Sequence, residues 1–398
     1  MDPPVQNSFR EPECLQSWDN HYSQQKASPM KQKATVLGID LAKRVFHLVG
    51  MNETGHVVLK KRLTREALLP FIAQLSPAII GMEACGGAHY WARRFRGYGH
   101  TVKLIAPQFV KPYVKSNKND PADAEAICEA VMRPTMRFVP IKEVEQQDLQ
   151  SLHRARERVV KARTALVNEI RGLAMEYGIV FPHSITKLRH TFAATLEAEQ
   201  DKLTPLSAEL FRQLYDEFGT LEKRLAYYNE KIAAICAAHP VCQRLGTIPG
   251  IGPLTATALV AAVSEASHFK NGRQFAAWIG LVPRQHSTGG KARLLGISKR
   301  GDVYLRTLLV HGARATLRWV GLKTDRRSQW VRSLIERRGK NKAAVAVANK
   351  NARIVWALLT TDQVYTAEHA AASGGEKQGM PVLSTRCEGH ISRDDRIG

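Results

Sequence analysis

Between Thr35 and about Phe138 the chain alternates short apolar runs with segments of helical periodicity, and this order restricts the fold more than any other feature of the sequence. The pattern predicts strands over residues 35–40, 44–50, 56–62, 78–83 and 101–105, and helices over residues 64–75, 88–97 and 120–132. Hairpin strands come first, with a turn at residues 52–55, and alternating helices and strands follow. This order predicts a mixed α/β sheet with helices on its faces.

Four carboxylates occupy special positions in this pattern. Asp40 ends the run Thr35-Val-Leu-Gly-Ile-Asp, and Glu83 ends Ala78-Ile-Ile-Gly-Met-Glu. Asp120 and Asp123 are spaced i, i+3 at a helix start, so their side chains point to one side. Carboxylates on the first strand, the fourth strand and a later helix are the arrangement of a ribonuclease-H-like domain. Oxygen ligands from three such elements suit two Mg²⁺ or Mn²⁺ ions in phosphoryl transfer.

Simpler interpretations exist for two of these residues. Asp120 before Pro121 is also an ordinary helix cap, and Asp123 in the first turn also favours the helix dipole. Asp40 and Glu83 are harder to explain in this way, because a carboxylate that closes an apolar strand needs a partner or an ion. Taken together, the four residues favour a metal site.

The charge of the chain indicates a polyanionic partner. Its 398 residues, long enough for two or three domains, include 58 Lys and Arg against 36 Asp and Glu. Between Lys291 and Arg353 there are seventeen Lys or Arg and three acidic residues, Asp302, Asp325 and Glu336. Such a density repels itself unless phosphates neutralise it, although a merely solvated basic surface is the alternative.

The cysteines and the apolar segments indicate the cellular compartment. The six cysteines show no C-x-x-C spacing and fit reduced thiols. No apolar run approaches the roughly 18–20 residues that span a bilayer, and the N-terminus has no signal-like segment. We therefore expect a soluble cytoplasmic protein with no membrane partner.

The sequence predicts five segments. Residues 1–33 and 361–398 are polar and without period, so we expect a disordered extension and a disordered tail. The α/β domain covers residues 34–140. Residues 141–240 hold two long amphipathic segments, 144–177 and 205–238, around a Phe181-Pro182 break, which predicts an antiparallel helical arm with coiled-coil packing. Residues 241–360 form a mainly helical C-terminal domain.

Two motifs in the C-terminal domain are suited to phosphate. Ile248-Pro-Gly-Ile-Gly-Pro matches a helix-hairpin-helix, in which Gly250 and Gly252 allow a tight turn whose backbone N–H groups can hold a phosphate, although an ordinary glycine turn is the alternative. A loop then carries two hydroxyls, Ser287 and Thr288, beside two glycines. The cations that flank them are Arg284, Lys291, Arg293, Lys299 and Arg300. From spacing alone, phosphate binding is favoured over attack on phosphate.

The motifs occur in the order found in a known family, which the chain resembles from about residue 34 to 360. The motifs are Gly38-Ile-Asp-Leu-Ala-Lys, Met82-Glu-Ala-Cys-Gly, Asn119-Asp-Pro-Ala-Asp-Ala, Ile248-Pro-Gly-Ile-Gly, Gly280-Leu-Val-Pro-Arg, Ser287-Thr-Gly-Gly-Lys and Ile297-Ser-Lys-Arg-Gly. They resemble the DEDD transposases of bacterial insertion sequences, which are bridge-RNA-guided recombinases.

The resemblance implies a site built from two domains. A RuvC-like domain would hold Mg²⁺ through Asp40, Glu83, Asp120 and Asp123, and the C-terminal domain would supply a serine that becomes joined to a DNA end. That serine corresponds to Ser287, whereas an alignment without a gap would put Thr288 there. The implied partners are double-stranded DNA at the element ends and target, a structured guide RNA, and further copies of the chain in a dimer or tetramer, in the cytoplasm near the nucleoid.

Two other functions remain open at this stage. Without the resemblance, the residues indicate a metal-dependent, junction-resolvase-like endonuclease that forms no covalent intermediate. The third class is a nucleic-acid-binding scaffold without activity, which the placement of all four carboxylates disfavours. A protein–DNA adduct would separate the recombinase from the resolvase.

Overall fold

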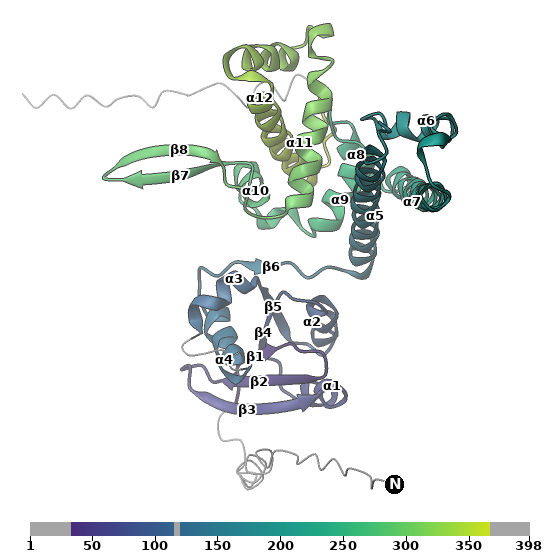
Figure 1. Ribbon diagram of the computed structural model, residues 1–398. Helices are drawn as coiled ribbons and strands as arrows, with labels where there is room; N and C mark the ends of the chain where they lie inside the picture. Colours follow the sequence, from purple (N-terminus) through teal and green to yellow (C-terminus); the bar gives the residue numbers. More distant parts are fainter. Residues whose placement is uncertain (1–32, 115–119, 367–398) are drawn as a thin grey trace, which may run out of the picture. The chain divides into compact units, whose positions relative to one another are not determined.

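The computed structural model describes residues 33–114 and 120–366 (Figure 1). The predicted disordered segments, 1–33 and 361–398, lie almost wholly outside these residues. The chain divides into two compact units between Glu143 and Val144. In the described residues no helix is both long and apolar enough to cross a membrane.

The N-terminal unit is built on a six-stranded mixed sheet of order β3-β2-β1-β4-β5-β6. Strands β1, β4 and β5 are parallel to one another, and β2, β3 and β6 run antiparallel to their neighbours. The strands are β1 (Val36–Asp40), β2 (Val45–Met51), β3 (Val57–Thr64), β4 (Ile79–Glu83), β5 (Thr101–Ile105) and β6 (Phe138–Val139), and the helices are α1 (Arg65–Ala73), α2 (Ala88–Gly97), α3 (Pro107–Val110) and α4 (Asp120–Val131). The predicted mixed sheet is thus confirmed.

Side chains of β1 and β4 point alternately to the two faces of this sheet, and helices pack against both faces. Leu37, Ile39, Ile80 and Met82 are fully buried on the face that packs against α1 and α2. Val36 shares the opposite face with the buried side of α4. The sheet therefore lies between two helical layers, as Figure 1 shows.

The second unit is helical apart from one hairpin. Its helices are α5 (Val144–Met175), α6 (Ile185–Ala198), α7 (Pro205–Ala238), α8 (Pro240–Gly246), α9 (Pro253–Ala262), α10 (Gly272–Ile279), α11 (Val303–Leu317) and α12 (Arg326–Thr360), and its strands are β7 (Pro283–Thr288) and β8 (Lys291–Ile297). Helix α12 is interrupted at Gly339, whose φ of 78° is not helical. The sequence predicted a loop where β7 and β8 form an antiparallel hairpin, and that prediction was wrong.

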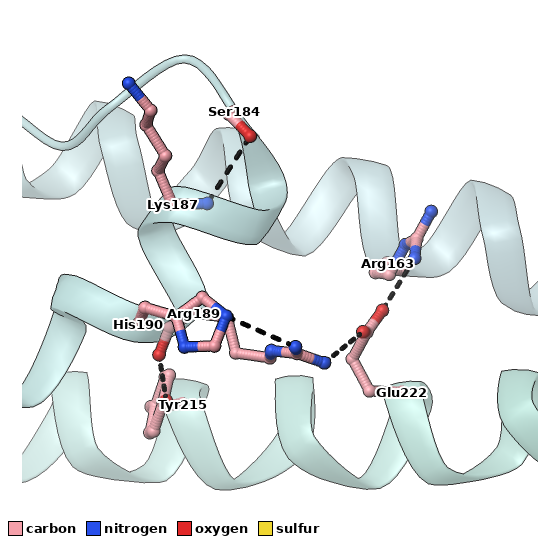
Figure 2. Close-up of polar contacts among 7 residues, drawn as sticks. All are labelled: Arg163, Ser184, Lys187, Arg189, His190, Tyr215 and Glu222. Carbon is pink, nitrogen blue, oxygen red and sulfur yellow. Dashed lines mark hydrogen bonds and ion pairs between the residues drawn. The ribbon is translucent and has the colours of Figure 1, made fainter.

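The two long helices of the predicted arm pack antiparallel. Arg163 of α5 donates to Glu222 of α7 over 2.6 Å. Seven residues earlier on α5, Arg156 donates to Asn229, which is seven residues later on α7, so the two helices run in opposite directions. Figure 2 shows that α6, which the sequence did not predict, joins this pair, because Arg189 also contacts Glu222 and Tyr215 Oη donates to the Arg189 carbonyl. The predicted antiparallel arrangement is confirmed; coiled-coil packing stays a prediction.

A buried imidazole fastens α5 to the rest of this unit. His153 of α5 is 3.0 Å from both Thr257 Oγ1 of α9 and Tyr304 Oη of α11. The Thr257 hydroxyl donates to the Pro253 carbonyl over 2.7 Å, so its oxygen accepts from His153 Nε2–H. Nδ1 then accepts from Tyr304. Burial and, to a smaller extent, the charge of the nearby Arg156 lower the pKa of His153 to about 4.

This imidazole makes stability depend on pH. The unfolded His153 would have an ordinary pKa near 6.5, so its contribution is complete above that value and is lost as the pH falls towards 4. Between pH 7.5 and 4.5 the free energy of unfolding should fall by about 2–3 kcal/mol through this group. Urea unfolding of His153→Gln should show a correspondingly weaker pH dependence than the wild type. The exposed His311→Gln serves as the control, and equal pH dependence in all three proteins would contradict the assignment.

Candidate nucleic-acid processing site

Asp40 and Glu83 lie beside each other at the carboxyl edge of the sheet. Strands β1 and β4 are parallel and pair Gly38 with Gly81 and Ile39 with Met82. Asp40 and Glu83 are therefore the next residues on adjacent strands and project to the same face. Because neighbouring strands are about 4.8 Å apart, their carboxylates share one small region.

Helix α4 covers the same face through two glycines. A Cβ at Gly38 would lie 2.2 Å from the Ala124 carbonyl oxygen, and a Cβ at Gly81 would lie 3.0 Å from Ile127. Only glycine leaves room for the helix to rest directly on β1. Cys128 of α4 also donates its Sγ–H to the Val49 carbonyl over 3.0 Å. Gly38 lies two residues before Asp40, and Gly81 lies two residues before Glu83. Because side chains alternate along a strand, both carboxylates therefore lie on the face of the sheet that α4 covers.

The start of α4 reaches the edge where Asp40 lies. Asp120 Oδ2 is 3.5 Å from His47 Nδ1, and His47 is the register partner of Asp40 on β2. His47 therefore links the helix-start carboxylate to the strand-end carboxylate. Asp123 follows in the first turn and is partly buried. The structure thus brings the neighbourhoods of Asp40, Glu83 and Asp120 together, as the sequence pattern predicts.

Two further residues at this edge were not singled out in the sequence. His47 is recognisable only through the antiparallel register of β2, which local sequence does not reveal. Cys85, two residues after Glu83, has its pKa raised by burial and then by the negative charges of Glu83 and Asp40. The last two causes place both carboxylates within electrostatic range of the Cys85 thiol.

The donor set suits a hard divalent ion. Carboxylate oxygens are the ligands that Mg²⁺ and Mn²⁺ prefer, and the imidazole of His47 is a compatible neighbour. Among residues 33–114 and 120–366 no group of three or more His, Cys, Asp or Glu side chains is already close enough to hold a metal. The fit therefore rests on the chemistry of the donors and on their shared edge.

The predicted hydroxyls lie on the β7–β8 hairpin of the other unit. Gly289 and Gly290, with φ of 57° and 75°, form its two-residue turn, where such positive values favour glycine. All residues of β7 are exposed. Ser287 pairs with Ala292, and Thr288 pairs with Lys291. The Ser287 hydroxyl accepts from Gln285 Nε2 over 2.7 Å.

The register separates the two hydroxyls. Ser287 shares its face of the hairpin with Gln285, Ala292 and Leu294, whereas Thr288 shares the other face with Lys291. His286 and Arg293 pair with each other on the Thr288 side. The sequence predicted a serine flanked by cations. In the hairpin Lys291 and Arg293 lie instead on the face that carries Thr288, so this prediction is only partly met.

The base of the hairpin is tightly built. Lys299 N–H donates to the Gly280 carbonyl, and the buried Arg306 donates to the carbonyls of Ile279 and Arg300 over 2.9 and 3.0 Å. A Cβ at Gly280 would lie 2.0 Å from the Arg300 carbonyl oxygen. Lys299 and Arg300 therefore fix the hairpin through their backbone and leave their side chains exposed, while Arg284 lies on the exposed strand β7.

In the turn between α8 and α9, the packing requires glycine at Gly250 but not at Gly252. Gly250 has a φ of 91°, and its Cβ would lie 2.7 Å from the Gly312 carbonyl oxygen on α11. Gly252 precedes α9, which has no side-chain cap, and a Cβ there would meet nothing within 4 Å. Phosphate binding at this turn stays a prediction, with Gly252 at its open side.

Comparison with known proteins finds a transposase family model that matches part of each unit. Residues 37–179 match the DEDD transposase family of IS110 type, and residues 242–330 match the family described as "Transposase IS116/IS110/IS902 family". The chain therefore belongs to the IS110 family of insertion-sequence transposases.

Three relatives illustrate the extent of the similarity. The "Probable family 20 transposase" of Pseudomonas aeruginosa is 53% identical over 83% of this chain and 98% of its own length. The transposase for insertion sequence element IS1111A of Coxiella burnetii is 51% identical over 83% of this chain and 91% of its own length. The transposase for IS1328 of Yersinia enterocolitica is 42% identical over 83% and 98%.

The packing of α4 on β1 can be tested without touching the carboxylates. Gly38→Ala forces a methyl group against the Ala124 carbonyl, so α4 must shift. We expect the free energy of unfolding of this unit to fall by about 1–3 kcal/mol and hydrogen exchange across Asp120–Val131 to accelerate. Gly97→Ala, at the end of α2 where a Cβ meets nothing within 4 Å, is the control and should neither lower the free energy of unfolding nor accelerate exchange across α4. Unchanged exchange in Gly38→Ala would show that α4 does not rest on Gly38.

Proposed function

We propose that the protein is a transposase that cleaves, exchanges and rejoins DNA strands with a divalent metal at the carboxyl edge of its sheet. The observation that carries this proposal is the placement of Asp40 and Glu83 on adjacent parallel strands, facing the helix that bears Asp120 and Asp123. Membership of a transposase family and the net charge of +22 support it. The strand order supports an RNase H-like, RuvC-like assignment of this unit.

In this proposal the protein's residues hold and orient the reacting groups. Asp40 and Glu83 would bind Mg²⁺ or Mn²⁺ from the strand ends, and Asp120 and Asp123 would complete the ligand set from the helix start. His47 would orient Asp120 through their 3.5 Å contact. When bound, the metal would lower the pKa of an attacking oxygen and stabilise charge on the phosphate.

The proposed nucleophile is the Ser287 hydroxyl. The hydroxyl would give up its proton to solvent as Oγ forms a bond to a DNA phosphorus. The bond from phosphorus to the departing deoxyribose oxygen would break, and that oxygen would take up a proton. Attack by another deoxyribose hydroxyl would reverse the step and reseal the strand. The exposed hairpin leaves room for a DNA backbone, and the cations Arg284, Lys291, Arg293, Lys299 and Arg300 would bind phosphates along it together with Thr288.

Three finer proposals accompany this mechanism. A structured non-coding RNA would select the element ends and target, while the protein would bind DNA through the basic C-terminal unit and through Gly250 and Gly252 in a helix-hairpin-helix. The helices α5 and α7 would join copies of the chain by coiled-coil packing, in a dimer or tetramer. The guide RNA rests on the resemblance, the helix-hairpin-helix on the turn that holds Gly250 and Gly252, and the oligomer on the resemblance and the antiparallel arm.

One observation favours the second candidate, a metal-dependent endonuclease without a covalent intermediate. Ser287 lies on the less charged face of the hairpin, with Ala292 as its register partner. A phosphate beside Thr288 and Lys291 would then be bound rather than attacked. The two candidates differ in whether a protein–DNA adduct forms.

The metal proposal is tested by neutralising one carboxylate. Asp40→Asn should reduce strand cleavage in Mg²⁺ to background, because one ligand charge is lost, while DNA binding stays equal or tightens. Calorimetric titration with Mn²⁺ should show weaker binding by the same variant. Glu53→Gln, an exposed carboxylate in the β2–β3 turn, is the control. Full cleavage and unchanged Mn²⁺ affinity in Asp40→Asn would remove Asp40 from the site.

The nucleophile is tested on a denaturing gel with labelled element-end DNA, Mg²⁺ and RNA transcribed from the element. A slow, protease-sensitive adduct should form with the wild type, disappear with Ser287→Ala and persist with Thr288→Ala. The reverse result would identify Thr288. Active protein that never forms an adduct would favour the endonuclease.

A further inference from the structure

The C-terminal unit contains a cavity that the proposed chemistry does not use. It has a volume of about 440 Å³ and lies among the start of α10, the second half of α12 and residues 363–366. Ligand pockets in proteins usually measure about 300–1,000 Å³, so a small group can enter. The side chains that matter here are Arg273, Lys350, Arg353, Trp356 and Tyr365.

Positive charge gathers around this cavity, where Lys350 Nζ also lies over the Trp330 ring, 4.8 Å from its centroid. Within residues 33–114 and 120–366, no carboxylate approaches Arg273, Lys350 or Arg353 within 4.0 Å, and no Asp or Glu lines the cavity. The neighbouring Asp362 instead pairs with Arg244 over 2.9 Å. Burial lowers the pKa of Lys350, and the charges of Arg327 and Arg353 lower it further. An anion in the cavity would relieve this repulsion.

The walls of the cavity are held firmly in place. A Cβ at Gly272 would lie 3.0 Å from both Cα and the carbonyl oxygen of Arg353, so α10 begins directly against α12. Trp356 Nε1–H is 3.1 Å from the carbonyls of Ala266 and Phe269, which orients the indole. Tyr365 Oη accepts from the buried Arg327 over 3.2 Å. Both aromatic side chains are thus fixed through their polar atoms.

We propose that this cavity binds one unpaired nucleotide of a nucleic-acid strand. The phosphate would lie among Arg273, Lys350 and Arg353, since guanidinium groups bind phosphate oxygens in pairs. The base would stack on Trp356 or Tyr365, a contact that any base can make. A phosphate alone would leave most of 440 Å³ unfilled, and an unpaired base can enter without the few kcal/mol that extruding a base from a duplex costs. The proposal rests on the proposed function only in that the protein acts on nucleic acids.

The test uses the full chain in buffer with EDTA, so that binding is measured without cleavage. Fluorescence anisotropy of a labelled single-stranded 12-nucleotide DNA should show the dissociation constant rising about 10-fold in Arg273→Gln and in Lys350→Gln, as expected for a lost charged hydrogen bond. The matched control is Lys187→Gln, an exposed lysine on α6, which should change it less than about 2-fold. Thermal unfolding of each variant confirms that it folds.

The base is tested separately from the phosphate. The wild type should bind the intact strand several-fold more tightly than the same strand with abasic sites, and Tyr365→Leu or Trp356→Leu should remove that preference. Equal binding of the intact and abasic strands by the wild type would mean a phosphate site and overturn the nucleotide proposal. Competition by adenosine monophosphate at concentrations similar to the strand would show that the cavity takes free nucleotides instead.

The failures of the two proposals can be told apart. If Lys350→Gln and Lys187→Gln bind the strand equally while the wild type still cleaves DNA in Mg²⁺, the cavity proposal fails and the proposed function stands. If the wild type binds neither single-stranded nor duplex DNA at low salt, both fail. Ultraviolet crosslinking of an iodouridine-containing strand to the peptide with Tyr365 would support the cavity directly.

Discussion

The close contact between α4 and β1 is the constraint on which the N-terminal unit depends. Because Gly38 has no side chain, the Ala124 carbonyl can lie where a Cβ would be, and the helix rests on the strand itself. That contact sets the position of α4 on the sheet, and Asp120 at the start of the helix lies 3.5 Å from His47. The carboxylates therefore converge through backbone packing, and the glycines matter to the site without any chemistry of their own.

The second unit follows a different principle, in which polar groups are buried among helices. His153, Thr257 and Tyr304 complete one another's hydrogen bonds across α5, α9 and α11. A network of this kind is favourable only when every member has a partner, since an unpaired buried polar group costs about 1–3 kcal/mol. The long helix α5 is therefore fixed near its N-terminal end to α9 and α11. Further along, it packs against α6 and α7.

The sequence predicted the central strands well because short apolar runs between turn residues have few alternatives, as in Ile79–Glu83. It missed the β7–β8 hairpin because β7 is polar and exposed, and because the two apolar residues Leu294 and Leu295 are adjacent in β8, so neither strand shows the alternation that identifies a strand. The Gly289-Gly290 turn was the remaining signal. It missed α6 although Ser184 caps its first turn. His47 and the α10–α12 cavity depend on residues distant along the chain, so local patterns could not reveal them.

The hairpin that carries Ser287 buries almost nothing, and this has a consequence for how the protein can change. Side chains that do not contribute to a core can be replaced with little effect on folding, because substitutions at exposed positions usually alter stability by less than about 0.5 kcal/mol. The positions where packing restricts the side chain are at the base of the hairpin, at Gly280 and Arg306. Apart from the Gly289-Gly290 turn and the two hydroxyl residues beside it, the exposed positions of the hairpin are thus free to vary under selection for what they contact. A new specificity could arise at these positions without a compensating change elsewhere in the fold.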